Sequence, residues 1–232
     1  MIPWLTSDIS FPPSERALTE PNGLLAVGGD LSCKRLIYAY SKGIFPWFNE
    51  DEPILWWTPD PRMVLFPAEL KISRSLRKAL QKHDYRVSAD RAFDQVITGC
   101  AAPRRNQSGT WINARMIEAY IELHRLGHAH SVETWIDGEL TGGLYGVALG
   151  RTFFGESMFS RVSDASKIAF VHLVRQLARW NFGIIDCQMK TAHLASLGAR
   201  EIPRTQFTRI IEELIHYGGA EGIWRFDNDL LE

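Results

Sequence analysis

The segment GIIDCQMK places Asp186 and Gln188 inside an apolar run. On a β-strand, alternate side chains point to the same face, so we expect Asp186 and Gln188 on one face and Cys187 on the other. This pattern argues against Cys187 as a nucleophile and favours Asp186 and Gln188 as a catalytic pair. The alternative is that Asp186 is a structural acid, paired for example with Arg200 or Arg204.

A second acid, Glu156, lies in the segment TFFGESMFSR. As a strand, this segment would place Phe154, Glu156 and Met158 on one face, with Gly155 allowing a close backbone approach. An unpaired carboxylate in apolar surroundings is costly. We therefore expect a cation on a ligand to contact Glu156.

Aromatic side chains gather in the proline-rich segment GIFPWFNEDEPILWWTPDPR. Trp47 is soon followed by the polar run NEDE, so we expect it at a rim where a ligand can reach it. At least one of Trp56 and Trp57 is expected to pack a small domain against a larger one, because an indole supplies much apolar area. Trp111, in SGTWINARM, is a second candidate for stacking on a ligand.

Basic residues follow this aromatic segment, in KISRSLRKALQKHDYR. At 100° per residue, a helix here places Ile72, Leu76, Ala79 and Leu80 on one side and Arg74, Arg77, Lys78 and Lys82 on the other. A solvated helix face is one interpretation. Phosphates need cations and unpaired bases need flat rings, so the basic helix beside the aromatic segment favours RNA as the partner.

The charge distribution supports a local anionic partner. The chain has 232 residues, 45% of them hydrophobic and 23% charged, and a net charge of −1, as in an ordinary globular protein. The net charge is −3 over residues 1–62, +5 over 63–125 and −3 over 126–232. A basic middle between acidic flanks predicts a local site for an anion.

Several other classes of protein are not indicated. The widely spaced Cys33, Cys100 and Cys187 fit buried thiols in a reducing compartment. The segment HRLGHAH lacks the HExxH pattern, and no GxxxxGK[ST], GxGxxG or GxSxG motif is present, so neither a metal nor a cofactor is expected. No apolar run approaches the roughly 20 residues of a membrane helix, and the first residues do not form a secretory signal. We expect a cytoplasmic protein.

The order of the expected elements predicts an α+β fold with a mixed sheet. Helices are expected over residues 32–43, 73–83, 90–102, 113–127, 163–180, 191–198 and 204–218. Strands are expected over residues 63–67, 129–136, 139–150, 152–160 and 183–189, with a hairpin turn at Asp137-Gly138. Residues 24–31 are expected to form a short strand and a glycine turn. TPDPR ends the proline-rich part, so we place a domain boundary near Arg62 and expect domains over 1–62 and 63–232. In the long helix, Phe170, Leu173, Val174 and Leu177 form a stripe that is typical of core, part of which can wall a pocket.

Blocks of sequence along the chain resemble the leucyl/phenylalanyl-tRNA–protein transferase family. They include EPNGLLAVGGDLS, GIFPWF, PILWWTPDPR, GTWI, LGHAHSVE, GGLYGV, FFGESMFSR, DCQ and HLASLGAREIPR, in one order from about Phe11 to Arg204. The resemblance implies a small N-terminal domain and a C-terminal domain similar to acetyltransferases of the GNAT superfamily. It also implies transfer of Leu or Phe, and Met less well, from aminoacyl-tRNA to proteins that begin with Arg or Lys, which marks them for degradation.

The resemblance assigns roles by position. Asp186 and Gln188 match the active-site pair, Glu156 a substrate-contacting acid, and Trp47 and Trp111 residues near the terminal adenosine. Leu144, Met158, Leu173 and Leu177 match the pocket for the transferred side chain, and Arg74, Lys78 and Lys82 the basic cluster for tRNA, to which the helix pattern adds Arg77. We expect Asp186 to accept a hydrogen bond from the attacking amine.

Two other functions stay open at this point. One is an acetyl-CoA-dependent N-acetyltransferase, which would need a glycine-rich loop before a helix, whereas SRVSDASK contains no glycine. The other is an RNA-binding module without catalysis. For an aminoacyl ester, which is already activated, no ATP is required, and we expect a monomer.

Overall fold

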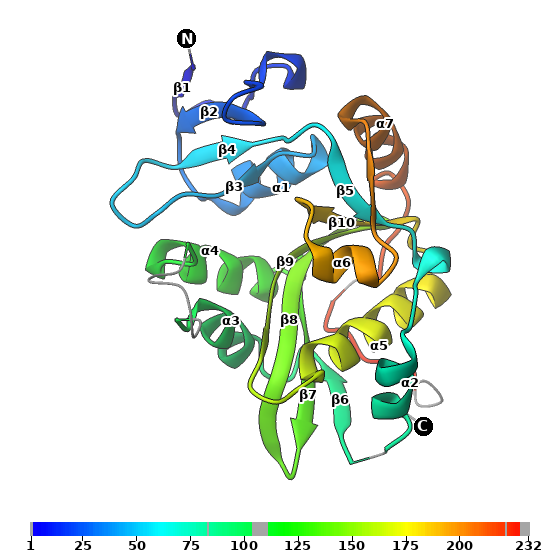
Figure 1. The fold of residues 1–232 in the computed structure, drawn as a ribbon. Helices are drawn as coiled ribbons and strands as arrows, with labels where there is room; N and C mark the ends of the chain where they lie inside the picture. The colour runs from blue at the N-terminus through cyan, green and yellow to red at the C-terminus, as the bar shows by residue number, and fades with distance from the viewer. Residues whose placement is uncertain (1, 83, 104–110, 221, 228–232) are drawn as a thin grey trace.

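The computed structural model describes residues 2–82, 84–103, 111–220 and 222–227 of the chain (Figure 1). The helices are α1 (Cys33–Ser41), α2 (Arg74–Leu80), α3 (Phe93–Ala101), α4 (Ala114–Arg125), α5 (Ala165–Arg179), α6 (Ala192–Ser196) and α7 (Arg204–Leu214). The strands are β1 (Trp4–Leu5), β2 (Leu24–Gly28), β3 (Phe45–Pro46), β4 (Leu55–Trp57), β5 (Arg62–Leu65), β6 (Arg86–Ala89), β7 (Ala129–Ile136), β8 (Glu139–Leu149), β9 (Thr152–Ser160), β10 (Ile184–Gln188) and β11 (Arg200–Ile202).

The strands among the described residues form two sheets. The smaller has the order β1-β2-β4-β3 and the larger the order β11-β5-β10-β9-β8-β7-β6. In the larger sheet β9 and β10 are parallel, and the other neighbouring strands are antiparallel. Parallel neighbours need a crossover connection, which α5 supplies. The predicted α+β fold with a mixed sheet is therefore confirmed.

The local signals in the sequence explain several element boundaries. The hydroxyl of Ser32 accepts a hydrogen bond from the Arg35 amide and caps α1. Asp137 and Gly138 have φ angles of 53° and 81° and join β7 to β8, as a two-residue hairpin turn requires. The predicted hairpin is confirmed.

Two short strands of the larger sheet are missing from the sequence-based expectation. β6 contains only four residues, and it begins at Arg86, which the basic-helix interpretation had placed in a helix. The helix is in fact limited to α2, from Arg74 to Leu80. β11 is three residues long and carries Arg200 and Glu201 exposed. A run of three or four residues is too short to be assigned from its pattern alone, even though β6 alternates exposed and buried residues, so pairing with neighbouring strands determines both.

The larger sheet has a separate core on each face. Figure 1 shows α3 and α4 on one side and α5 with α2 on the other. Neighbouring strand residues divide between these cores: Phe154 and Ile184 belong to the first, and Phe153 and Ile185 to the second. Among the described helices, none combines the length and the apolar character needed to cross a membrane.

The first core continues from the larger sheet into the N-terminal part of the chain. Leu36 and Trp56 from that part belong to the same cluster as Val64 and Phe154, and Figure 1 shows the smaller sheet and α1 lying against one end of the larger sheet. The residue at the expected domain boundary, Arg62, is the first residue of β5. The boundary itself stays a prediction.

Two β-bulges interrupt the strands that carry the candidate catalytic residues. In β9, Gly155 and Ser157 face successive residues of β8, which leaves Glu156 as the extra residue. In β10, Asp186 and Gln188 face successive residues of β5, which leaves Cys187 extra. A bulge changes which face the following side chains meet. The structure thus corrects the expectation for Met158, which packs on the second core instead of sharing a face with Phe154.

Candidate active site

A cavity of about 560 Å³ lies where the N-terminal part meets the larger sheet. Phe45, Pro46 and Trp47 line it from the N-terminal part. Its other walls come from Trp111 and from residues of β8, β9, β10, α5 and the segment that includes α6. These elements converge near the middle of Figure 1. Glu156 and Gln188 both line this cavity.

Glu156 and Gln188 are in direct contact. The amide Nε2 of Gln188 donates a hydrogen bond of 3.0 Å to Oε1 of Glu156. Gln188 has a φ angle of 61° at the end of the β10 bulge, a left-handed conformation that is uncommon for a residue with a side chain. The two bulges therefore bring together an amide and a carboxylate from parallel neighbouring strands.

Asp186 shares this side of β10 with Gln188, as the sequence predicts, but its carboxylate is occupied. Nε and Nη2 of Arg62 donate to Oδ1 and Oδ2 of Asp186 at 2.8 and 2.6 Å, and both side chains are buried. The Gln188 backbone amide also donates to Oδ1, at 2.9 Å. Three donors thus already bind this buried carboxylate, although Asp186 also lines the cavity, and the expected contact between Asp186 and an attacking amine stays a prediction.

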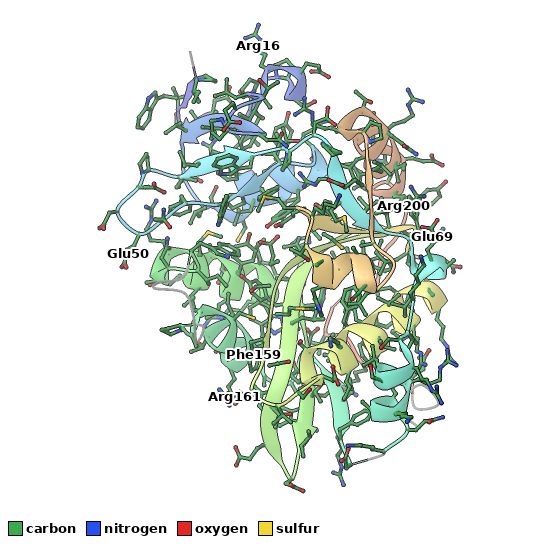
Figure 2. All side chains as sticks on the ribbon, in the orientation of Figure 1. Arg16, Glu50, Glu69, Phe159, Arg161 and Arg200 are labelled. Atoms are coloured by element: carbon green, nitrogen blue, oxygen red, sulfur yellow. The ribbon has the colours of Figure 1, made fainter. Side chains whose placement is uncertain are left out.

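Arg62 also settles the alternative left open for Asp186. Its guanidinium lies 4.8 Å from the Phe45 ring centre and 4.7 Å from that of Phe207. The two candidate partners bind elsewhere: Arg200 pairs with Glu69 on the surface (Figure 2), and Arg204 donates to the Thr58 carbonyl at 2.7 Å.

Glu156 receives two further hydrogen bonds from buried phenols. Tyr40 donates to Oε1 at 2.7 Å and Tyr120 to Oε2 at 3.1 Å, and the two hydroxyls also contact each other. Burial raises the pKa of Glu156 to about 7, even though the bonds from both phenols lower it. The charge of Asp186 raises this pKa and that of Arg62 lowers it. Burial also raises the pKa of both phenols well above the usual value, so they remain protonated donors.

Cys187 lies on the other side of β10, with Ile185 in the second core. Burial and the nearby Asp186 carboxylate raise the pKa of the Cys187 thiol far above its usual value. A thiol must lose its proton to act as a nucleophile. As predicted, Cys187 packs with Ile185 against the second core, but it also lines the cavity together with Asp186 and Gln188.

The tryptophans divide into packing residues and rim residues, as expected from the sequence. Trp47 is 37% exposed and lines the cavity, and Trp111 lines it too while partly buried. Trp57 supports Trp47, because its Nε1 donates to the Trp47 carbonyl at 2.7 Å and the rings lie 5.5 Å apart. Trp56 is fully buried and donates to the Gly28 carbonyl. Trp56 is thus a packing residue, and Trp47 lies at the cavity rim.

The expected apolar pocket is only partly assembled as predicted. Leu144 and Met158 face each other across β8 and β9 and line the cavity. Leu173 and Leu177 do not line it, since both are completely buried in the second core. Phe170, from the same stripe of α5, reaches the cavity in their place. The stripe runs along the helix axis, so only its N-terminal part can reach the wall.

The predicted basic cluster lies apart from the cavity. Arg74, Arg77, Lys78 and Lys82 are exposed on and just after α2. The opposite side of this helix buries Leu76 in the second core, as the helical pattern predicts. Figure 1 shows α2 beside α5, away from β3 and β10. The structure therefore presents these cations as a separate surface and not as part of the cavity lining.

The histidines of HRLGHAH have packing roles in the structure. His130 stacks on Trp224 with ring centres 3.8 Å apart, and its Nδ1 lies 2.9 Å from Oδ2 of Asp90. His124 stacks on Phe93 at 4.3 Å. Within the described ranges, no group of three or more His, Cys, Asp or Glu side chains could bind a metal ion.

Three residues that shape the site were not predicted from the sequence: Arg62, Tyr40 and Tyr120. Arg62 was noted only as a boundary, and neither tyrosine was singled out. Their partners are 124, 116 and 36 residues away along the chain. A local pattern contains no signal for contacts of this range.

The Arg62–Asp186 pair gives a test of stability. Arg62→Met leaves a buried carboxylate without its partner, so we expect the free energy of unfolding to fall by about 3–5 kcal/mol. Replacing both residues, as Arg62→Met with Asp186→Leu, removes the unpaired charge and should restore most of that loss. Arg200→Ala, which breaks the exposed pair with Glu69, is the control and should cost at most about 1 kcal/mol. Urea denaturation measures all three. Equal losses for Arg62→Met and Arg200→Ala would contradict this account.

Comparison with known proteins identifies the family. Residues 29–60 match the N-terminal domain of leucyl/phenylalanyl-tRNA protein transferase, and residues 64–212 match leucyl/phenylalanyl-tRNA protein transferase. The chain is 68% identical to the leucyl/phenylalanyl-tRNA–protein transferase of Nitrosospira multiformis over 100% of both chains. It is 66% identical to that of Nitrosomonas europaea, over 98% of this chain and 96% of the relative.

Similar solved structures are much more distant. L-PGS from Bacillus licheniformis has a TM-score of 0.40 at 11% identity, over 69% of this chain and 52% of its own. A GCN5-related N-acetyltransferase from Kribbella flavida has a TM-score of 0.37 at 9% identity, over 72% of this chain and 60% of its own. The sequence matches are the informative ones: they show that this chain is an aminoacyl-tRNA–protein transferase and belongs to the leucyl/phenylalanyl-tRNA–protein transferase family.

Proposed function

We propose that this enzyme transfers Leu or Phe, and Met less well, from aminoacyl-tRNA to the α-amine of proteins that begin with Arg or Lys. The product carries a new peptide bond, and the added residue marks the protein for degradation. One observation carries this proposal: a single cavity combines an apolar wall at Leu144 and Met158 with the polar pair Glu156 and Gln188. An apolar side chain and a reacting amine can occupy such a cavity together.

The apolar wall supports the choice of transferred residue. Leu144, Met158 and Phe170 line this part of the cavity. Such side chains favour Leu, Phe and Met over polar residues, since a buried polar group without a partner is costly. Met158 is unbranched and can change its shape. The wall can therefore fit either the flat ring of Phe or the branched chain of Leu.

The aromatic rim supports binding of the terminal adenosine of tRNA. Trp47 and Trp111 both line the cavity, and Trp47 is held by Trp57. A base stacked on an aromatic side chain gains about 1–3 kcal/mol. We propose that the adenosine stacks at this rim and thereby places the aminoacyl ester over the apolar wall.

The exposed cations of α2 support binding of the tRNA body. Arg74, Arg77, Lys78 and Lys82 form one solvent-facing surface. Contacts between cations and phosphates are independent of sequence and weaken as salt increases. This fits a ligand whose identity is read at its aminoacyl end while its stem is held by charge.

The polar pair supports binding and orientation of the acceptor. We propose that Glu156 contacts the cationic N-terminal region of the acceptor and that Gln188 holds the amine or the ester carbonyl. Asp186 then acts as a positioning residue, through its bond to the Gln188 backbone. Positioning can supply roughly 7–11 kcal/mol of a barrier. The ester is already activated, so neither ATP nor a cofactor is required.

The remaining expectations concern the cellular setting. Cys33 and Cys187 are free thiols, which suits a reducing compartment and supports a cytoplasmic enzyme. We also propose that the enzyme acts as a monomer.

The proposed reaction can be tested directly. Purified enzyme is mixed with Leu-tRNA carrying a radiolabelled amino acid and a peptide that begins with Arg. We expect label in the peptide, and none in a matched peptide that begins with Glu, because the described cavity lining offers a carboxylate and neither Lys nor Arg to the acceptor. A parallel reaction with labelled acetyl-CoA should give no product. Transfer from acetyl-CoA in place of Leu-tRNA would overturn the proposal.

The aromatic rim gives a second test. Trp47→Ala removes the exposed ring, so we expect the KM for aminoacyl-tRNA to rise about 10- to 100-fold, in line with the loss of one stacked base. The kcat at saturation should change less. Trp4→Ala is the control, because Trp4 is 68% exposed and lies on β1 outside the cavity. An unchanged KM for Trp47→Ala would rule out stacking at this rim.

Salt dependence tests the basic surface. We expect Arg74→Glu with Lys78→Glu to weaken tRNA binding and to flatten the slope of log Kd against log salt by about one for each phosphate that is no longer bound. Arg16→Glu with Arg209→Glu changes the net charge equally at exposed positions elsewhere, including Arg16 in Figure 2. Filter binding at several salt concentrations measures the slopes. Equal effects of the two double variants would show that only the overall charge matters.

A further inference from the structure

Glu156 is held by donors from three separate elements. Tyr40 comes from α1, Tyr120 from α4 and Gln188 from β10, and their bonds to the carboxylate measure 2.7, 3.1 and 3.0 Å. The carboxylate is also the extra residue of the β9 bulge. This arrangement fixes both oxygens at the cavity wall, and none of the three donors is a cation.

The two acids of the site therefore differ in chemical capacity. Asp186 is paired with the Arg62 cation through two short bonds. The three donors to Glu156 are neutral. A neutral donor can stay bonded when the carboxylate gains a proton, since the other oxygen still accepts. Glu156 can therefore gain and lose a proton without breaking an ion pair.

We propose that Glu156, positioned by Tyr40 and Tyr120, carries the proton of the attacking amine to the departing ribose oxygen. This inference rests on the proposed aminoacyl transfer. The amine nitrogen forms a bond to the ester carbonyl carbon, and its proton passes to Glu156. The bond from that carbon to the ribose oxygen breaks, the electron pair goes to the oxygen, and Glu156 returns the proton to it. The products are an amide and a ribose hydroxyl, and Glu156 is again a carboxylate.

The electrostatic surroundings support this shuttle. A group that first accepts and then donates a proton works best with a pKa near the working pH, and burial raises the pKa of Glu156 to about 7. The titratable and charged groups that face it are Tyr40 from α1, Tyr120 from α4, Tyr145 from β8, Asp186 from β10 and Arg62 from β5. Both phenols that contact Glu156 stay protonated at neutral pH.

The direction of the pH effect follows from these contacts. Glu156 accepts a proton only while ionised, so kcat should fall as the pH drops below its pKa. The bonds from Tyr40 and Tyr120 lower that pKa. Removing either hydroxyl should therefore raise the pKa and move the acidic limb of the kcat profile to higher pH.

The experiment measures kcat against pH with both substrates saturating. We expect an acidic limb near pH 7 for the wild type and a shift of about one unit upward for Tyr40→Phe and for Tyr120→Phe, as for loss of a hydrogen bond to a charged group. Tyr38→Phe is the matched control, because Tyr38 lies on the same helix and packs its ring against Phe11. Thermal unfolding of each variant checks that it is folded.

The α-amine of the acceptor titrates in the same range, at roughly 7.7–8 when free, so its limb must be separated. Two acceptor peptides with different amine pKa values serve for this purpose. The limb that reports the amine should move in pH when the peptide is changed. The limb that reports Glu156 should move when Tyr40 or Tyr120 is replaced. If the only limb moves with the peptide and ignores Tyr40→Phe and Tyr120→Phe, the shuttle is overturned.

Glu156→Gln tests the proton transfer without relying on the tyrosine variants. As a proton carrier, Glu156 predicts a kcat lower by about 10²- to 10⁴-fold and the loss of its acidic limb. A higher peptide KM with unchanged kcat would mean that Glu156 only binds the acceptor, and it would overturn the inference. If the wild type itself transfers no amino acid, the proposed function fails. If it does transfer and the limb stays in place in the Phe variants, only the inference fails.

Discussion

The site depends on one buried ion pair, between Arg62 and Asp186. It joins β5 to β10 inside the larger sheet, and the guanidinium lies between the rings of Phe45 and Phe207. A charge in such surroundings is stable only while its partner and hydrogen bonds stay in place. The pair therefore fixes the path of β10 at the point where the strand bulges. Because Asp186 also binds the backbone amide of Gln188, the ion pair helps to set the position of Gln188 in the cavity.

The two bulges, together with the ion pair, determine where Glu156 and Gln188 lie. Regular strands would place side chains at fixed two-residue intervals, which leaves little freedom to aim a carboxylate from β9 at an amide from β10. The extra residues Glu156 and Cys187 shift the intervals in both strands. Glu156 then meets Gln188, and the Cys187 thiol turns into the second core, where it is inert. Since bulges lengthen the strand locally without opening the sheet, both cores stay closed around the site.

The strongly periodic parts of this structure could be predicted from the sequence. Features that depend on contacts between residues far apart in the chain could not. The hairpin at Asp137-Gly138, the long helix α5 and the strand with Asp186 and Gln188 follow from local patterns, and all are present. The partner of Asp186 is not local, so Arg62 was overlooked while Arg200 and Arg204 were considered. Met158 was placed on the wrong face because no single-residue pattern announces the bulge at Glu156. Leu173 and Leu177 show that an apolar stripe cannot reveal which of its members reaches a cavity.

The cavity is built from residues on both sides of the boundary that the sequence indicates near Arg62. The composition changes near Arg62, yet Tyr40, Phe45 and Trp47 precede that point and take part in the site. Tyr40 crosses to Glu156 because the first core runs without interruption from α1 to β9. An N-terminal part that only held RNA would need aromatic rings and cations at its surface. The exposed ring of Trp47 would meet the first of these needs. A buried hydroxyl on the carboxylate of the other sheet serves no such purpose. The N-terminal part therefore forms one wall of the cavity and contacts Glu156 directly, instead of standing apart as a separate binding module.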